Sequence, residues 1–555
     1  MAFVIGVVIV FIALSIFLYK DERRRYRERL QAEKDRWGHQ KVDDFNFSLI
    51  ARYSDRNLTP SFHRLSDQTK NDIDFYDLFV VVDRTITRIG QQFLFDKLQR
   101  PTDKVGELKR LDATAELFRT DAKLRSDVIE TLFPLQHKDN YFTQSLIGKK
   151  LIKRPRWFRY LFLSPFVIVA LLLIGTKNPV AIICLIVPFV INSIIHFWNK
   201  SNTYSFLTSL PQLNNVIGVS KKLNAIAAIR SQEADQCIAA LQPFQRKYNL
   251  VRFGGDTSPG GDLNVIAYYL VELIKAFTLF EVFVFFNLIK ELENTNKSIQ
   301  TLLNFVADTD IALSVASLRS GALKTCAPDF TTHQKELTMV EGYHPLIKSC
   351  VVNTLGIRDK SVLITGSNMS GKTTFLRSML INSLMAQTVY TCFATSFKTP
   401  VLKQYSSIRI QDDIIDGKSL YFQEVNTMKE LLRASDEDTR GIFVLDEVFK
   451  GTNTVERIAA SKAILTYLNK GNNIVLVATH DLELTQLLQS EYDLYHFTEV
   501  VENNVLTFDH RIKEGHLRTR NAIRVLELSH YPTEIVVEAK QLSEVLSKTN
   551  YQPTP

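Results

Sequence analysis

Cysteine is scarce in this sequence, with five residues among 555. They are scattered along the chain, and no two have the Cys-x-x-Cys spacing of a zinc or redox motif: Cys184, Cys237, Cys326, Cys350 and Cys392. The sequence therefore provides neither a disulfide framework nor a cysteine-based zinc site. Isolated thiols of this kind are typical of a reducing compartment.

Charged residues are absent from Ala2 to Tyr19, a run of 18 residues. A membrane-spanning helix needs roughly 20 apolar residues, so the run is long enough to be an anchor. A cleavable signal peptide is the alternative, but it would have a basic start and a small-x-small cleavage site. Neither is present, and the basic stretch KDERRRYRER follows directly. We therefore expect an uncleaved transmembrane anchor over residues 1–19.

A second apolar block, from 158 to 198, is broken only by the short polar turn TKNP. It predicts a helical hairpin across the bilayer, and a buried hairpin is the alternative. Basic clusters flank both apolar regions: Lys20, Arg23, Arg24 and Arg25, then Lys149, Lys150, Lys153, Arg154, Arg156 and Arg159. The positive-inside rule places both clusters in the cytoplasm and the N-terminus outside. We expect a multi-pass protein of the cytoplasmic or inner membrane, with everything after the hairpin facing the cytoplasm.

The stretch 265–289 is also apolar, but it contains Glu272, Lys275 and Glu281. A charge near the centre of a bilayer costs about 2.5–3.5 kcal/mol, so we expect a packed or interfacial helix there and not a further span.

The length predicts two to four domains, because 555 residues exceed what one core can bury. A formal charge of +8 fits either nucleic-acid binding or the basic flanks of a membrane protein. Along the chain, the periodicity is helical up to about residue 320 and then alternates between short apolar runs and helices, which is the rhythm of an α/β domain. The expected divisions are residues 1–19 (anchor), 20–64 (charged helical linker), 65–157 (core helices), 158–198 (membrane hairpin), 199–335 (further helices), 336–545 (α/β domain) and 546–555 (tail).

The stretch LITGSNMSGKTTFLRS, residues 363–378, contains Gly-x-x-x-x-Gly-Lys-Thr between an apolar run and an expected helix. Glycines let the backbone N–H groups of such a loop surround phosphates, the lysine reaches the β- and γ-phosphates, and the threonine hydroxyl binds Mg²⁺. The helix that follows adds its N-terminal dipole. We therefore expect ATP and Mg²⁺ to be bound by Gly366, Ser367, Asn368, Met369, Ser370, Gly371, Lys372, Thr373 and Thr374.

Two further apolar runs end in polar residues. GIFVLDE, residues 441–447, predicts a buried strand that delivers Asp446 to the Mg²⁺ and Glu447 to the attacking water. IVLVATH, residues 474–480, predicts another strand that ends at His480, whose imidazole can hold the water or sense the γ-phosphate. Glu447, His480 and Lys372 are the expected catalytic residues.

These motifs together resemble the MutS family of DNA mismatch repair ATPases, whose ATPase domain is of the ABC type. The resemblance rests on TGSNMSGKTTFLRS, VLDEVFKGTNT and VATHDLELTQL, and it extends to DLFVVVDRTITRIGQQFLFDKLQRP (77–101), FVADTDIALSVASLRSGAL (305–323), VEGYHPLI (340–347) and residues 509–539. It implies an all-helical core and lever domain followed by a P-loop α/β ATPase domain, here combined with membrane helices. It also implies a homodimer with composite sites, in which Ser419 and Asn453 act on the partner's nucleotide. His510 matches a histidine that contacts adenine, whereas Val351 and Val352 stand where the family often has an aromatic residue.

The resemblance implies DNA binding, but the sequence argues against mismatch reading. About 64 residues precede the core, and the Phe-x-Glu triplets at Phe422 and Phe497 lie in the ATPase region, so neither is the wedge that enters DNA. The Arg-rich segment 23–36 could contact phosphates, although a solvated flank of the anchor is favoured. The alternative function is an ATP-driven switch acting on a membrane or protein partner. Two or three spans are few for a transport pathway, which argues against an ABC transporter.

Overall fold

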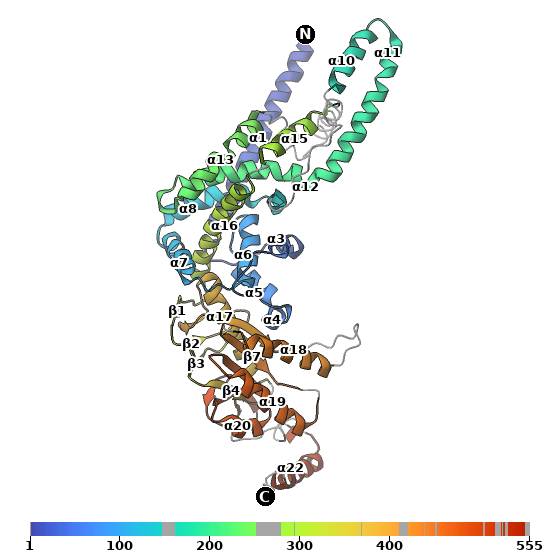
Figure 1. The fold of residues 1–555 in the computed structure, drawn as a ribbon. Helices are drawn as coiled ribbons and strands as arrows, with labels where there is room; N and C mark the ends of the chain where they lie inside the picture. The colour runs from blue at the N-terminus through green and yellow to red at the C-terminus, as the bar shows by residue number, and fades with distance from the viewer. Residues whose placement is uncertain are drawn as a thin grey trace.

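The computed structural model is elongated, with an N-terminal helix and a helical hairpin at one end and an α/β domain at the other (Figure 1). It describes residues 2–146, 160, 163–250, 279–292, 295–367, 369–409, 420–437, 439–449, 452–502, 505–516, 523, 526–527 and 531–549. The basic cluster before the hairpin and residues 265–278 of the apolar stretch lie outside the described residues.

Short polar side chains begin several helices of the first half by accepting a hydrogen bond from the first turn. Ser66 accepts from the backbone N–H of Thr69 at 3.1 Å, and Asp121 accepts from that of Leu124 at 2.9 Å. The helices up to residue 132 are α1 (Ala2–Asp35), α2 (Phe47–Ile50), α3 (Arg52–Arg56), α4 (Asp67–Asp72), α5 (Phe75–Val82), α6 (Arg88–Gln99), α7 (Val105–Thr120) and α8 (Ala122–Leu132).

The segment 20–64, which we predicted to be a charged linker, is built into the helical core. Leu30 of α1 and Ile50 of α2 are buried in the core, and Lys41 forms a buried ion pair with Asp83 at 3.1 Å. The apolar residues of this segment contact partners far along the chain, as Tyr26 does with Phe133 at ring centroids 5.1 Å apart. Its packing therefore depends on distant partners that the local pattern does not show.

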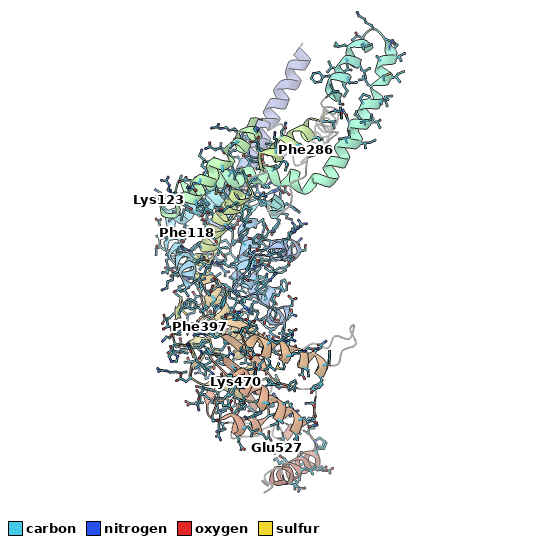
Figure 2. All side chains as sticks on the ribbon, in the orientation of Figure 1. Phe118, Lys123, Phe286, Phe397, Lys470 and Glu527 are labelled. Carbon is cyan, nitrogen blue, oxygen red and sulfur yellow. The ribbon has the colours of Figure 1, made fainter. Side chains whose placement is uncertain are left out.

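The predicted membrane hairpin is a helical hairpin in the structure, made of α10 (Ser164–Gly175), α11 (Pro179–Cys184) and α12 (Ile186–Asn224). It projects from the same end of the molecule as the start of α1 (Figure 1). The side chains drawn on α10 and α11 stand out around the projecting part of the hairpin (Figure 2). Helix α12 continues without a break into the core, where Leu213, Ile217 and Leu223 are buried.

By length and composition, one helix in the described part of the chain could cross a membrane, and it is α16 (Asn296–Arg319). Since 78% of its apolar window is buried inside the structure, α16 has the surroundings of a core helix. The apolar helices of the hairpin are shorter than that criterion requires. The spans expected at residues 1–19 and 158–198 therefore remain predictions.

Helix α16 is the central element of the helical part. It packs against α6, α7 and α13 (Gln232–Leu250), and α15 (Phe280–Leu292) packs against α13 and α12. Its buried Asp310 accepts hydrogen bonds from the backbone N–H groups of Ile86 and Thr87, at 2.9 and 2.8 Å, and from the hydroxyl of Thr87 at 2.6 Å. A carboxylate from one helix thus holds the start of another, since Thr87 is the N-cap of α6.

The α/β domain is built on a six-stranded sheet in the order β12-β9-β4-β8-β7-β6. All neighbours are parallel except β12 and β9, and the central strands β4 and β8 are buried along their whole length. The apolar runs predicted as strands match β4 (Ser361–Thr365), β7 (Gly441–Asp446) and β8 (Ile474–Thr479), and the outer strands are β6 (Lys403–Ser407), β9 (Tyr492–His496) and β12 (Lys513–Glu514).

A second, four-stranded sheet, with the order β1-β5-β2-β3, lies beside the first. Its strands are β1 (Pro328–Phe330), β2 (Glu336–Gly342), β3 (Asn353–Arg358) and β5 (Ser396–Thr399), and a separate hairpin is formed by β10 (Glu499–Glu502) and β11 (Val505–Phe508). The helices of this domain are α17 (Lys372–Val389), α18 (Leu420–Ser435), α19 (Thr454–Leu468), α20 (Leu482–Leu488) and α22 (Thr533–Thr549). The fold is therefore helical in its first half and α/β in its second, as predicted.

Two acidic residues of the helical part bind the α/β domain. Asp72, at the end of α4, accepts hydrogen bonds from the hydroxyl of Ser406 at 2.7 Å and from the backbone N–H groups of Ile408 and Arg409 at 3.0 and 2.8 Å. Asp74 forms ion pairs with Arg409 and with Arg377, an α17 residue. The two halves are thus joined by polar contacts directly behind the helix that follows the phosphate loop.

Candidate active site

The loop between β4 and α17 carries the Gly-x-x-x-x-Gly-Lys-Thr motif. Gly366 and Gly371 have φ of +151° and +112°, which L side chains rarely adopt. A Cβ on Gly366 would meet the carbonyl oxygen of Phe497 at 2.7 Å. The loop therefore needs glycine at these positions both for its backbone path and for its close approach to the neighbouring chain. This is the compact shape in which backbone N–H groups can surround phosphate oxygens.

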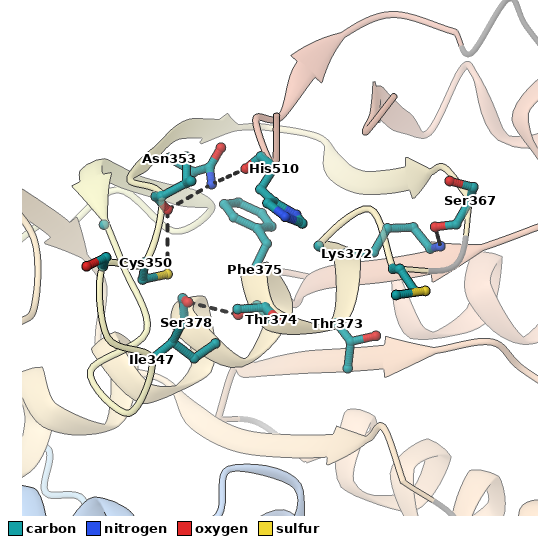
Figure 3. Close-up of a pocket in the computed structure, with 15 residues that line it drawn as sticks. Ile347, Cys350, Asn353, Ser367, Lys372, Thr373, Thr374, Phe375, Ser378 and His510 are labelled. Carbon is teal, nitrogen blue, oxygen red and sulfur yellow. Dashed lines mark hydrogen bonds between the residues drawn. The ribbon is translucent and has the colours of Figure 1, made fainter. Parts of the chain in front are cut away.

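Lys372 is the first residue of α17, and its side chain is buried. Its Nζ donates a hydrogen bond to the carbonyl oxygen of Gly366 at 2.7 Å. It donates another to that of Ser367 at 2.9 Å (Figure 3). The ammonium group is therefore held inside the loop and near the N-terminus of the helix, where phosphate groups are recognised.

Thr373 and Asp446 face each other across the site. The hydroxyl of Thr373 donates to Oδ2 of Asp446 at 2.5 Å, so the first turn of α17 and the end of β7 present two oxygen ligands together. Hydroxyl and carboxylate oxygens are the hard ligands that Mg²⁺ prefers. The pair thus matches the donor set of a Mg²⁺–nucleotide site.

Glu447 and His480 are brought together by the adjacent strands β7 and β8. Oε1 of Glu447 lies 2.8 Å from Nε2 of His480, and that nitrogen lies 3.4 Å from Nζ of Lys372. Glu447 has a left-handed backbone with φ of 58°, and its N–H donates to the carbonyl of Ala478 at 2.9 Å. A non-glycine residue is rarely held in this conformation, and residues held so are concentrated at functional sites.

A cavity of about 390 Å³ extends from the loop towards β2 and β3 (Figure 3). One wall is His510, whose Nδ1 lies 3.0 Å from the carbonyl oxygen of Ser370. Asn353 fixes that wall, because its Nδ2 donates to the carbonyl of His510 at 3.0 Å and its Oδ1 accepts from the N–H of Ile512 at 2.8 Å. The cavity is lined by Gly342, Ile347, Ser349, Cys350, Val351, Asn353, Ser367, Met369, Gly371, Lys372, Thr373, Thr374, Phe375, Ser378 and His510.

Several residues of the site were missed by reasoning from the sequence. Phe508 stacks on His510 with ring centroids 6.0 Å apart, so an aromatic ring lies behind the histidine. Arg457 of α19 forms a two-bond ion pair with Asp481, at 2.9 and 2.7 Å, beside His480. The signal available was the Asp that follows His480 directly, but its partner on another helix could not be identified from spacing.

The residues predicted to act across a dimer are described only in part. Asn453 is the N-cap of α19, and its side chain accepts from the N–H of Glu456 at 3.0 Å. Asn is a good N-cap residue, which accounts for its presence at this position. Ser419, and Asn368 of the phosphate loop, lie outside the described residues.

The phosphate loop, the Thr–Asp pair and the acid and histidine on adjacent strand ends define a P-loop nucleotide-binding domain. Residues 362–547 match MutS domain V. The chain is also similar to proteins named DNA mismatch repair protein MutS. It is 32% identical to that of Lactobacillus gasseri over 277 residues, which are 47% of this chain and 32% of the relative. It is 30% identical to that of Lactobacillus johnsonii over 317 residues (55% and 36%) and 31% identical to that of Oceanobacillus iheyensis over 275 residues (46% and 31%).

The comparisons support a relationship to the MutS family. The chain spans about a third of the length of the curated relatives it matches. The matched family model covers residues 362–547, which belong to the α/β domain.

Proposed function

We propose that this chain is a membrane-associated ATPase of the MutS type, which binds and hydrolyses ATP in sites shared by two copies. The observation that carries the ATPase part is the convergence of three strand ends. The loop after β4, Asp446 at the end of β7 and His480 after β8 meet around Lys372. Adjacent carboxyl ends of parallel strands are where α/β domains bind nucleotides.

Each residue has a role that follows from its position. Lys372 would bind the β- and γ-phosphates in exchange for the loop carbonyls, and Thr373 and Asp446 would hold Mg²⁺, which would neutralise charge on the phosphates. Glu447 would accept a proton from the attacking water. His480, within hydrogen-bonding distance of Glu447, would orient that carboxylate and the water. The cavity beside His510 would take the nucleoside.

Separate variants test these roles. Lys372→Ala should lose nucleotide binding, because the charge that meets the phosphates is removed. Glu447→Gln should bind ATP normally but turn it over about 10²-fold or more slowly, because the general base is lost. Glu483→Gln, on the exposed start of α20, is the matched control and should behave as wild type. Wild-type turnover by Glu447→Gln would remove Glu447 from the mechanism.

The shared site has its own test. Ser419 and Asn453 would reach the nucleotide of the partner copy, since the cleft of one ABC-type domain is open on one side. Neither Ser419→Arg nor Lys372→Ala should be active alone. A mixture should recover part of the activity, because one of the two sites in a mixed dimer keeps all its residues. Mixed dimers without recovery would contradict the shared site.

The hairpin supports membrane association. On α10, six large apolar side chains are between 47% and 68% exposed: Phe166, Val167, Val169, Leu172, Leu173 and Ile174. Contiguous apolar surface of this kind marks a membrane or protein contact. With the basic residues in the second half of α1 inside, the ATPase domain would face the cytoplasm. In intact cells and in a chain without native cysteines, Cys introduced at Asn178 should react with an impermeant reagent. Cys at Asp35 or Ser435 should not, and labelling of Ser435 without lysis would overturn this topology.

Two outputs of the ATPase are open to test. The relatives named DNA mismatch repair protein MutS favour DNA, and the exposed hairpin favours a switch that acts on the membrane or on a protein in it. Detergent-solubilised protein should be titrated with duplex DNA at several salt concentrations, with and without a mismatch. Affinity that falls steeply with salt would support DNA contacts, because bound phosphates release counterions. If duplex DNA is not bound even at low salt, the remaining candidate is a membrane or protein partner.

A further inference from the structure

Cys326 and Cys392 stand opposite each other in an antiparallel bridge. The N–H of Cys326 donates to the carbonyl of Cys392 at 2.9 Å, and the N–H of Cys392 donates to the carbonyl of Cys326 at 2.8 Å. Two residues that exchange both bonds in this way have Cα atoms about 5.5 Å apart. Disulfides have Cα–Cα distances in the same range. The backbone therefore already holds the two cysteines at the spacing of a disulfide.

The two side chains also lie on the same face of the bridge, because residues directly opposite each other in an antiparallel pair do. Both are free thiols, and Sγ of Cys392 donates to the carbonyl oxygen of Asn382 at 3.5 Å. Interaction with the side chain of Cys392 lowers the pKa of Cys326, and Arg319 nearby acts in the same direction. Burial raises the pKa of Cys392. Cys326 is partly exposed and Cys392 is buried, so the thiol that ionises more readily is also the one that a reagent can reach.

The bridge lies where the lever helix meets the helix of the phosphate loop. Cys326 follows α16 along the chain, and Cys392 follows α17. Arg319, the last residue of α16, already contacts this segment, because its guanidinium donates to the carbonyl of Tyr390 at 2.7 Å and to the hydroxyl of Thr391 at 3.0 Å. A covalent bond here would fix α16 to the end of α17 at the point where only hydrogen bonds hold them now.

We propose that Cys326 and Cys392 are a redox-modification site, which forms a reversible disulfide by exchange with a small-molecule disulfide such as oxidised glutathione. The Cys326 thiolate attacks one sulfur of that disulfide and releases one thiolate. The Cys392 sulfur then attacks Sγ of Cys326, and the second small thiol leaves with the proton of Cys392. The two cysteines are oxidised and one disulfide is reduced to two thiols. This chemistry does not depend on ATP hydrolysis.

The test uses the full-length chain in detergent, incubated with defined ratios of reduced to oxidised glutathione and then alkylated. Peptide mass spectrometry should find the peptides of Cys326 and Cys392 joined and lighter by two hydrogen atoms, with Cys184 and Cys237 alkylated. Since the bond closes a long loop, the unfolding temperature should rise by about 5 °C on oxidation and return on reduction.

Variants at each position keep the result interpretable. Cys326→Ser and Cys392→Ala should each abolish the joined peptides and the shift in unfolding temperature, whereas Cys184→Ser should retain both. Because Cys392 is buried, Cys326→Ser is the variant that preserves the fold if Cys392→Ala does not. A stable glutathione adduct on Cys326 with Cys392 still reduced would overturn the proposal. Joined peptides that appear only after denaturation would overturn it equally.

Discussion

Helix α16 and the hairpin α10–α12 are both apolar, but their surroundings are opposite. Helix α16 is long enough to cross a membrane, yet most of it is buried among other helices, and its Asp310 is fully hydrogen-bonded. The apolar stretches of the hairpin, Phe166–Gly175 and Pro179–Ile195, are shorter, yet they leave a continuous apolar surface uncovered by other described residues. Length and hydropathy alone would therefore choose the buried helix over the exposed hairpin.

The two regions differ in what their side chains contact. A core helix can carry a carboxylate where another element supplies donors, and Asp310 receives two backbone N–H groups and a hydroxyl. In the described part of α10–α11, the side chains that face outward are apolar and only the turn is polar. Lipid tails or an apolar partner would cover such a surface without any change in the core.

The largest expected effect follows from placing charges on the hairpin. If Val169 and Leu173 face lipid, Val169→Lys combined with Leu173→Lys should weaken membrane insertion by about 5–7 kcal/mol, since each central charge costs about 2.5–3.5 kcal/mol. The measurement is co-flotation of the protein with phosphatidylcholine–phosphatidylglycerol vesicles after removal of detergent.

A matched control places the same charges on equally exposed apolar residues at the other end of the molecule. Leu542→Lys with Val545→Lys, on α22, should leave flotation unchanged. If the hairpin variant floats as well as wild type, the contrast drawn between the hairpin and α16 is wrong, because the hairpin then needs no apolar environment.

The next effect concerns the core helix. Asp310→Ala would leave three buried donors unpaired at the start of α6, and we expect a loss of about 3–5 kcal/mol in the free energy of unfolding. Chemical denaturation at pH 7 measures it. Asn304→Ala, on the exposed face of α16, should change stability little, and a similarly small loss for Asp310→Ala would mean that water replaces the carboxylate.

Much of the site could be predicted from the sequence because its information is local. The phosphate loop needs glycines at fixed positions, and Asp446, Glu447 and His480 each follow an apolar run that is a buried strand in the structure. Once strands are parallel and adjacent, their ends must meet. The same reasoning identified the apolar hairpin, since composition alone defines it.

What the sequence could not show are the contacts between distant segments. Asp72 lies 334 positions before Ser406, and no local pattern in α4 indicates that its carboxylate holds the end of β6. The same holds for Arg457 with Asp481, and for the packing of residues 20–64. In each case a polar or isolated apolar residue is ordinary in its own segment and acquires its partner only from the tertiary fold.

The smallest expected effect is a loss of core stability at acidic pH, which the exposed hairpin should not share. His63 lies half-buried against β6, and its Nε2 must donate to the carbonyl of Gln404, 2.9 Å away, because a carbonyl can only accept. Burial lowers the pKa of His63 from 6.5 to about 4. The unfolded chain therefore binds a proton between pH 6.5 and 4 that the folded chain does not, so acid removes stability in this window.

His344 also loses stability on acidification, since burial lowers its pKa to about 4 as well. Asp310 acts in the opposite direction, because burial raises its pKa to about 6 and its protonation in the folded state stabilises the protein as the pH falls. The contribution of His63 is isolated by His63→Gln, which keeps a donor for Gln404. Between pH 7 and 5 this variant should lose about 1–2 kcal/mol less stability than wild type, as measured by denaturation at each pH. The exposed His137→Gln is the control and should follow wild type.

Vesicle flotation should not change between pH 7 and 5, because the apolar side chains that form the described surface of α10 do not titrate. A parallel loss of flotation and stability on acidification would show that the hairpin depends on the core after all.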